Sequence, residues 1–200
     1  MNPGGIFLDR DGTINEEVDF LSSPNNLHIL QGSVEAIREA NVLGLKVFII
    51  TNQSGIARGF LTENDLQNIH TELLHRLEEY HVRIDAIYYC PHHPELGNPP
   101  YNISCTCRKP NIGMLQKAVE QFGVDLKKSF VIGDRMIDIQ TGNNAEAISI
   151  LVLTGYGKEE LNLCKNTQVH IDYVASDLHD AIQFVKRTLQ QEHAPVSRNQ

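Results

Sequence analysis

Two carboxylates one residue apart follow a short apolar run near the N-terminus. Asp9 and Asp11 come directly after Ile6-Phe7-Leu8, and Gly12 permits a turn that brings both side chains to one region. A carboxylate nucleophile can accept a phosphoryl group as an aspartyl-phosphate, and a second carboxyl group can protonate the leaving oxygen and later deprotonate the attacking water. The spacing therefore fits a carboxylate pair in which one group is the nucleophile and the other is the acid and base.

A phosphate monoester is negatively charged, so a carboxylate nucleophile needs cations beside it. Mg²⁺ prefers oxygen ligands and keeps several of its waters, so a few protein oxygens are enough to hold it. Asp9 and Asp134 fit as ligands, and the carbonyl oxygen of Asp11 is a plausible third. These residues form the predicted magnesium site.

Further groups able to stabilise phosphoryl oxygens come from two other segments. Lys109 offers fixed positive charge, and the Thr51 hydroxyl and the Asn52 amide can donate hydrogen bonds. Each signal alone is more typical of an ordinary turn or helix start. Their joint occurrence, with Asp9, Thr51 and Asp134 each at the end of an apolar run, favours one shared site.

Cysteine and histidine gather between positions 90 and 107. Cys90-Pro91-His92 and Cys105-Thr106-Cys107 supply three thiolates and an imidazole, the composition of a closed tetrahedral zinc site. The loop between them is rich in proline and has little to pack with, so a metal would supply order there. Four protein ligands leave no position for water, which favours a structural zinc. Ordinary reduced thiols are the less favoured alternative, and His93 is the rival to His92.

The composition narrows the class of partner. The net charge of −8 argues against a nucleic-acid binder, but a few local cations and a metal can still bind one small phosphorylated molecule. No apolar run approaches the ~20 residues of a membrane helix, and the first residues do not resemble a signal peptide. We therefore expect a cytoplasmic monomer without membrane partners.

Short β-branched runs separated by helical patterns indicate how these residues are positioned. The runs at 6–8, 46–50, 130–132 and 148–152 are typical of parallel strands buried on both faces. Helices are expected from a Ser33 cap to Gly44, from a Thr62 capping box, from Pro110 in a first turn to Gly123, and from Leu178 to Gln190.

The alternation predicts an α/β fold with a doubly wound, mainly parallel sheet, helices on both faces and a zinc-clipped loop. We expect one phosphatase domain over residues 1–190, which includes the zinc loop 90–107, and a frayed tail over 191–200. Parallel strands place their carboxyl ends on one rim, so Asp9, Thr51-Asn52 and Asp134 should converge there.

The ordered motifs also resemble a known family. Asp9-Arg10-Asp11-Gly12-Thr13, Thr51-Asn52-Gln53, Arg108-Lys109-Pro110 and Gly133-Asp134 resemble the motif set of the haloacid dehalogenase-like (HAD-like) phosphatases. Two longer stretches, 51–59 (TNQSGIARG) and 88–94 (YYCPHHP), are similar to the histidinol-phosphate and heptose-bisphosphate phosphatase branch. The resemblance runs from about Gly5 to Gly157.

The resemblance implies a role for each motif residue. Asp9 would be the nucleophile, and Asp11 would be the acid and base. Asp9, Asp11 and Asp134 would hold Mg²⁺, Thr51 and Lys109 would steady the phosphoryl group, and zinc would bind Cys90, His92, Cys105 and Cys107. Arg135 stands where the family often has Lys, which keeps the charge but changes the geometry. The residues expected to bind substrate are Glu17, Val18, Asp19, Phe20, Thr51, Asn52, Gln53, Ser54, Arg108, Lys109 and Arg135; those at 17–20 rest on family analogy alone.

The same resemblance implies a substrate. The heptose-bisphosphate branch removes the 7-phosphate of a heptose 1,7-bisphosphate through an aspartyl-phosphate, on the route to ADP- or GDP-heptose. Arg108 next to Lys109 suits a substrate with a second negative group. A histidinol-phosphate phosphatase is the first alternative, and a metal- and phosphate-binding module without turnover is the second.

Overall fold

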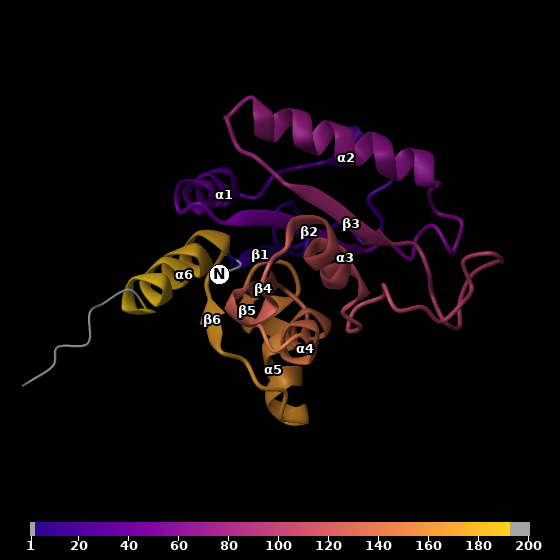
Figure 1. Ribbon diagram of the computed structural model, residues 1–200. Helices are drawn as coiled ribbons and strands as arrows, with labels where there is room; N and C mark the ends of the chain where they lie inside the picture. Colours follow the sequence, from indigo (N-terminus) through magenta and orange to yellow (C-terminus); the bar gives the residue numbers. More distant parts are fainter. Residues whose placement is uncertain (1–2, 193–200) are drawn as a thin grey trace, which may run out of the picture.

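The computed structural model describes residues 3–192, which form one six-stranded parallel sheet with helices on both faces (Figure 1). The strand order is β3-β2-β1-β4-β5-β6, so the direction of winding reverses beside β1. The predicted doubly wound sheet is confirmed. The strands are β1 (Gly5–Leu8), β2 (Lys46–Asn52), β3 (Ala86–Cys90), β4 (Phe130–Gly133), β5 (Ile148–Val152) and β6 (Tyr173–Ala175).

Six helices cover the sheet in the described part of the chain, three on each side (Figure 1). One side carries α1 (Ser33–Val42), α2 (Glu63–Glu78) and α6 (Leu178–Glu192). The other carries α3 (Gly113–Phe122), α4 (Met136–Asn144) and α5 (Gly157–Thr167). Short 3₁₀ turns lie at Pro24–Asn26 and Leu126–Lys128.

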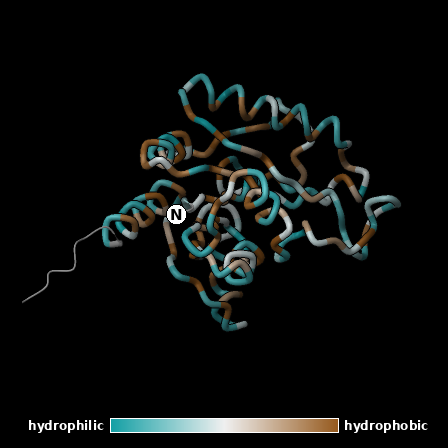
Figure 2. The backbone as a smooth tube through the Cα atoms, in the orientation of Figure 1, coloured by the Kyte–Doolittle hydropathy of each residue, from teal (hydrophilic) through white to brown (hydrophobic). Residues whose placement is uncertain are grey.

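The central strands are apolar throughout because both of their faces are covered. Successive side chains of a strand point to opposite faces. Ile6 and Leu8 pack in the cluster shared with α1, α2 and α6, whereas Phe7 packs with α3. Figure 2 shows the hydrophobic colour along these strands and mostly polar colour on the outward turns of the helices. The short apolar runs in the sequence are therefore strands buried on both sides, as predicted.

Two of the predicted helix starts require correction. Gly32, with a φ of 83°, is the N-cap of α1, and Ser33 lies in the first turn, where its hydroxyl donates to the Thr13 carbonyl at 3.4 Å. The helix assigned to Pro110 begins instead at Gly113, whose N–H donates to the Thr106 carbonyl at 3.0 Å. Residues 108–112 form a turn at the site instead of a helical first turn.

Other helix ends lie at the residues that the sequence predicts. Thr62 and Asp65 form the predicted capping box of α2, with each side chain accepting from the backbone N–H of the other residue. Gly123, at a φ of 66°, ends α3 as predicted. The last helix continues to Glu192, two residues past the predicted end, and the rest of the predicted frayed tail lies outside the described residues. No helix within residues 3–192 combines the length and apolar character needed to cross a membrane.

Candidate active site

Three strand ends meet on one rim of the sheet. β1 lies between β2 and β4, all parallel, with Leu8 in register with Ile49 and Ile132. Asp9 follows directly, and its N–H donates to the Ile132 carbonyl at 2.9 Å. Asp134 lies in the same way after β4, and Thr51 lies near the end of β2. The rim therefore brings the three predicted segments together.

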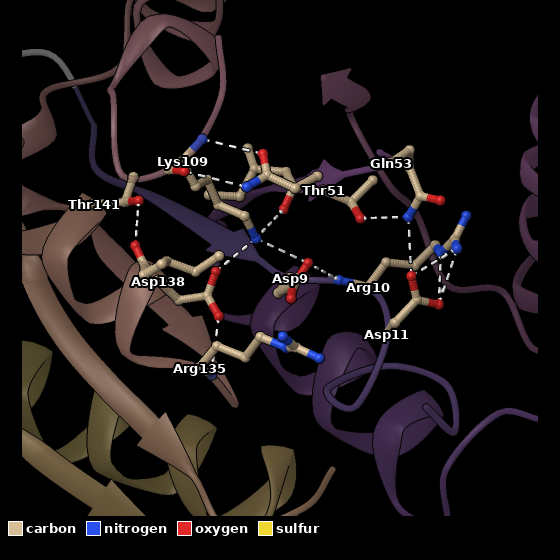
Figure 3. Close-up of polar contacts among 12 residues, drawn as sticks. Asp9, Arg10, Asp11, Thr51, Gln53, Lys109, Arg135, Asp138 and Thr141 are labelled. Atoms are coloured by element: carbon tan, nitrogen blue, oxygen red, sulfur yellow. Dashed lines mark hydrogen bonds and ion pairs between the residues drawn. The ribbon is translucent and has the colours of Figure 1, made fainter. Parts of the chain in front are cut away.

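A buried lysine links two carboxylates at the centre of this rim. The Lys109 Nζ lies 2.9 Å from Asp9 Oδ1 and 2.5 Å from Asp138 Oδ1, and it donates to the Ile50 carbonyl at 3.0 Å (Figure 3). Burial alone would lower the pKa of Lys109, but Asp138 and Asp9 raise it above its ordinary value. Lys109 is therefore a fixed positive charge beside the candidate nucleophile.

Asp134 lies close to the carboxylates of Asp9 and Asp138. Its Oδ2 accepts from the Tyr156 N–H at 2.8 Å, whereas its buried Oδ1 has no hydrogen-bond partner within residues 3–192. Burial, followed by the Asp9 and Asp138 carboxylates, raises the pKa of Asp134 to about 8, and burial raises that of Asp9 to about 6 against the pull of Lys109. The carboxylates of Asp9, Asp134 and Asp138 therefore carry more negative charge than Lys109 alone can neutralise.

The donor set fits a hard divalent cation. Oxygen atoms of Asp9, Asp134 and Asp138 lie within 4.8 Å of one another, and all-oxygen ligation is what Mg²⁺ prefers. Asp138 already accepts from Lys109 and from the Arg135 N–H. Asp9 and the unpartnered Oδ1 of Asp134 are therefore the oxygens best placed to hold such an ion.

The second carboxylate of the motif is held by three side chains. Asp11 accepts from Arg10 at both oxygens and from Gln53 Nε2 at 2.9 Å (Figure 3). It also accepts from Asn15 Nδ2 at 2.9 Å. Burial alone would raise the pKa of Asp11, but the Arg10 charge and these hydrogen bonds keep it below its usual range. The structure therefore holds Asp11 as a carboxylate in a fixed orientation.

The residues after β2 complete the rim in different ways. Gln53 Nε2 donates to the Thr51 hydroxyl at 2.8 Å as well as to Asp11. The Asn52 side chain pairs with the backbone of Lys109, accepting its N–H at 3.1 Å and donating to its carbonyl at 3.2 Å. Asn52 thus fastens the turn that carries Lys109, a contact that its sequence position does not reveal.

A cavity of about 230 Å³ opens above the rim. The lining residues are Asp9, Asp11, Glu17, Asp19, Phe20, Thr51, Asn52, Gln53, Ser54, Gly55, Arg58, Arg108, Lys109, Arg135 and Ile137. This set includes every residue predicted to bind substrate except Val18, which is exposed and does not line the cavity among the described residues. The loop that follows the nucleophile motif therefore does reach the cavity, through Glu17, Asp19 and Phe20.

Two guanidinium groups line one side of the cavity without a carboxylate partner. Arg108 donates to the His92 carbonyl at 3.0 Å, and Arg58 lies 5.6 Å from the centre of the Phe20 ring. Neither forms an ion pair within the described part of the chain, although Arg135 on the other side pairs with Glu17 at 3.6 Å. Burial lowers the pKa of Arg108, and the nearby Arg58 charge lowers it further. This side of the cavity is suited to an anion.

The cysteine and histidine residues of the loop also come together. The Cys105 Sγ lies 3.4 Å from that of Cys90 and 3.3 Å from that of Cys107, and the His92 Nδ1 lies 3.5 Å from the Cys107 Sγ. These four ligand atoms lie within 4.8 Å of one another and can hold one metal ion. His93 instead accepts from two backbone N–H groups, those of Glu95 and Leu96.

Several residues at the site carry roles that sequence reasoning did not assign. Arg58 lies within the family-like stretch 51–59, and Arg10 lies between the two motif aspartates. Both positions in the sequence are therefore a signal that these residues belong to the site. His70, which contacts Arg10, lies on α2 and far from any motif in sequence. Only the packing of α2 against the rim identifies it.

Comparisons with known proteins agree with this geometry. A HAD-hydrolase-like family model matches residues 106–181. A D-glycero-D-manno-heptose-1,7-bisphosphate 7-phosphatase of Chlorobaculum tepidum is 39% identical over 183 residues, covering 88% of this chain and 91% of the relative. A D-glycero-beta-D-manno-heptose-1,7-bisphosphate 7-phosphatase of Escherichia coli K12 is 36% identical over 182 residues, covering 91% of this chain and 93% of the relative.

A solved structure is similar over nearly the whole chain. The D,D-heptose 1,7-bisphosphate phosphatase from B. bronchiseptica, complexed with magnesium and phosphate, aligns with a TM-score of 0.79 at 33% identity. The alignment covers 94% of this chain and 99% of that one. With the rim of carboxylates, the buried lysine and the two arginines of the cavity, these similarities show that the chain belongs to the heptose-1,7-bisphosphate 7-phosphatase family of the HAD-like hydrolases.

Proposed function

We propose that this chain is a Mg²⁺-dependent phosphatase that removes the 7-phosphate of a heptose 1,7-bisphosphate, a step toward ADP- or GDP-heptose. The observation that carries the proposal is the arrangement around Asp9. Its carboxylate contacts Lys109 and lies close to Asp134, which has one oxygen without a hydrogen-bond partner within residues 3–192. Asp9 lines a cavity together with two guanidiniums that form no ion pair in that part of the chain. The names of the relatives support the substrate.

The arrangement supports a two-step reaction. A carboxylate oxygen of Asp9 attacks phosphorus, and the bond from phosphorus to the sugar oxygen breaks. The leaving alkoxide takes a proton from Asp11, which has to take that proton up from solvent before this step because the resting group is a carboxylate. Water then attacks the aspartyl-phosphate, Asp11 accepts its proton, and inorganic phosphate leaves. Lys109 and the Thr51 hydroxyl stabilise the charge on the transferred group.

Asp9 and Asp134 are the residues that would hold Mg²⁺. When bound, the ion supplies positive charge that neutralises the phosphoryl oxygens and reduces their repulsion of the carboxylate nucleophile. The observation that supports this assignment is the Asp134 Oδ1, which has no hydrogen-bond partner among the described residues. Asp138 orients Lys109 and contributes to the negative charge of the site.

The substrate's second phosphate is assigned to the guanidinium side of the cavity. Arg108 follows Cys107 and precedes Lys109, so it lies within one residue of the cation at the reacting phosphate. Arg58 approaches from the loop after β2. A planar guanidinium can bind two phosphate oxygens at once. Histidinol phosphate carries an amine in place of a second phosphate, and two adjacent guanidiniums repel an amine.

A substrate comparison tests the assignment. We expect kcat/KM for heptose 1,7-bisphosphate to exceed that for histidinol phosphate by at least about a hundredfold, which corresponds to about 2.7 kcal/mol and is within the range of a charged contact. Arg108→Ala should reduce this preference by about tenfold while changing hydrolysis of 4-nitrophenyl phosphate by less than about threefold. Arg83→Ala, which removes an exposed arginine on the edge of the sheet, is the charge-matched control.

Each outcome of that comparison has a clear meaning. Equal or better use of histidinol phosphate would overturn the heptose assignment, whereas the proposed phosphatase chemistry would still stand. If the Arg108→Ala variant keeps the full preference for heptose 1,7-bisphosphate, Arg108 does not bind the second phosphate. Absence of phosphate release from any phosphoester with Mg²⁺ would favour the metal- and phosphate-binding module over an enzyme.

The cysteine and histidine cluster is proposed to bind a structural zinc. Three sulfurs and one imidazole nitrogen satisfy tetrahedral zinc without an open position for water. The cluster is tied to the active site, because Arg108 donates to the His92 carbonyl and Lys109 lies two residues after Cys107. Zinc would therefore set the position of both cations from a distance.

Removing one ligand tests the zinc proposal. Protein purified without chelator should contain about one zinc per chain, and Cys105→Ser should lose most of it and unfold at a lower temperature, because metal-binding free energy contributes to folding. Cys164→Ser is the matched control, since Cys164 is buried outside the cluster. Zinc-free protein, or a Cys105→Ser variant with full zinc content, would contradict the proposal.

A further inference from the structure

Arg10 is an arginine in an unusual place. It lies between the two motif aspartates, yet its side chain is 0% exposed and is one of the largest fully buried side chains of the described chain. A buried charge is costly unless it is paired and hydrogen-bonded. Arg10 meets this condition by turning to Asp11: Nε lies 3.1 Å from Oδ1, and Nη2 lies 2.9 Å from Oδ1 and 2.7 Å from Oδ2 (Figure 3).

The opposite end of the guanidinium contacts a histidine on α2. Arg10 Nη1 lies 3.2 Å from His70 Nε2, and His70 is itself buried. A guanidinium is only a donor, so His70 Nε2 accepts, and the ring is neutral with its proton on Nδ1. Burial, and then the Arg10 charge, lower the pKa of His70 to about 3, so the ring stays neutral at working pH.

His70 is itself held in place. Its ring lies edge-on to the Tyr89 ring, with centroids 5.9 Å apart. The Tyr89 hydroxyl donates to the Glu63 carboxylate at 2.7 Å, which ties β3 to the first turn of α2. The contacts thus run from a rigid helix through His70 to Arg10 and on to the Asp11 carboxylate.

We propose that His70 is a positioning residue that acts through Arg10 to hold the Asp11 carboxylate in the orientation from which it accepts the proton of the attacking water. The inference rests on the proposed function, in which Asp11 is the acid and base. His70 is not among the described residues that line the cavity. Its contribution is to fix the guanidinium, which then leaves Asp11 one orientation within the cavity.

The two steps of 4-nitrophenyl phosphate hydrolysis isolate this role. Nitrophenolate leaves without needing a proton, so the burst of nitrophenol reports transfer to Asp9, whereas steady-state turnover reports water attack aided by Asp11. His70→Met replaces the imidazole nitrogen with a thioether, which is only a weak acceptor on an adaptable side chain, whereas His70→Gln keeps a strong acceptor for Arg10. The pair therefore differs mainly in the hydrogen bond.

We expect His70→Met to lower steady-state kcat by about tenfold, with the burst rate and KM within about threefold of wild type. His70→Gln should stay within about threefold in every measurement. If His70→Met does not fold, His70→Asn takes its place, because its shorter side chain cannot bring an acceptor to Arg10. Equal losses in burst and turnover, or equal losses in the Gln and Met variants, would overturn the proposal.

A double-mutant cycle tests whether His70 acts through Arg10. In an Arg10→Lys background the cation is kept but its ammonium cannot contact both Asp11 and His70, so adding His70→Met should lower kcat by less than about twofold more. The same tenfold loss in both backgrounds would show that His70 acts independently and would overturn the inference. Failure of wild-type protein to release nitrophenol at all would instead overturn the proposed function, so the two failures are distinguishable.

Discussion

Replacing Asp9 with asparagine is expected to lower turnover by at least about 10⁴-fold, because an amide does not form the aspartyl-phosphate. The fold should persist. Asp9 is buried among Asp138, Asp134 and Lys109, and burial already raises its pKa to about 6, so its ionised form is disfavoured in the folded protein. Without metal, a neutral side chain there should leave the melting temperature unchanged or raise it.

Metal dependence supplies the matching measurement. Mg²⁺ should raise the melting temperature of wild type, because an ion that binds the folded state stabilises it, and should raise that of Asp9→Asn much less, because the variant has lost a ligand charge. Melting curves with chelator and with Mg²⁺ give this comparison. An Asp9→Asn enzyme within about tenfold of wild-type turnover would remove the covalent mechanism.

The companion variant Asp11→Asn separates the two carboxylates. Asp11→Asn loses the proton transfer but keeps the nucleophile, so acid quenching during reaction with 4-nitrophenyl phosphate should label Asp9. A label on Asp11 in the wild type, or no label in either protein, would contradict the assignment of roles.

Replacing Lys109 with methionine is expected to damage both stability and activity. The substitution leaves Asp9 and Asp138 buried without the cation that contacts both, at 2.9 Å and 2.5 Å. Removing one partner of a buried ion pair typically costs about 3–5 kcal/mol of unfolding free energy. Loss of the fixed charge at the transferred phosphoryl group should also lower kcat by about 10²–10³-fold.

A double variant separates these two effects. Adding Asp138→Asn to Lys109→Met removes one of the uncompensated carboxylates. The free energy of unfolding of this double variant, measured by urea unfolding in chelator, should therefore recover most of the loss. Turnover should not recover, because the charge at the phosphoryl group is still missing. Equal stability of the single variant, the double variant and wild type would show that the buried ion pairs do not stabilise this fold.

The sequence by itself determined the four central strands of the sheet and the chemistry of their rim. Short runs such as Ile6-Phe7-Leu8 are too short for helices and apolar on both faces, so they specify buried parallel strands. Parallel strands place their carboxyl ends together, so strand direction alone puts Asp9, Thr51 and Asp134 on one edge of the sheet. In the same way, three thiols and an imidazole within one loop specify a metal-binding composition wherever the loop lies.

The local pattern was insufficient where tertiary contacts compete with it. Pro110 suits a first helical turn, yet the turn before α3 is held by contacts of Asn52 with Lys109 and of Gly113 with Thr106, so the helix starts later. β6 has three residues, Tyr173–Ala175, and pairs only because β5 presents an edge. Three residues carry too little periodicity to distinguish a strand from a loop.

Only the tertiary structure decided which side chains act together. The place of Arg10 between two aspartates gives no sign that its side chain is buried, but α2 packs over it, and Asp11 and His70 contact its guanidinium. Arg58 and Arg108 lie fifty residues apart in sequence and line the same cavity because two loops fold onto the same rim. Residue type and spacing fix what a group can do, whereas the direction of a side chain and its partners depend on packing between segments distant in sequence, which local patterns do not encode.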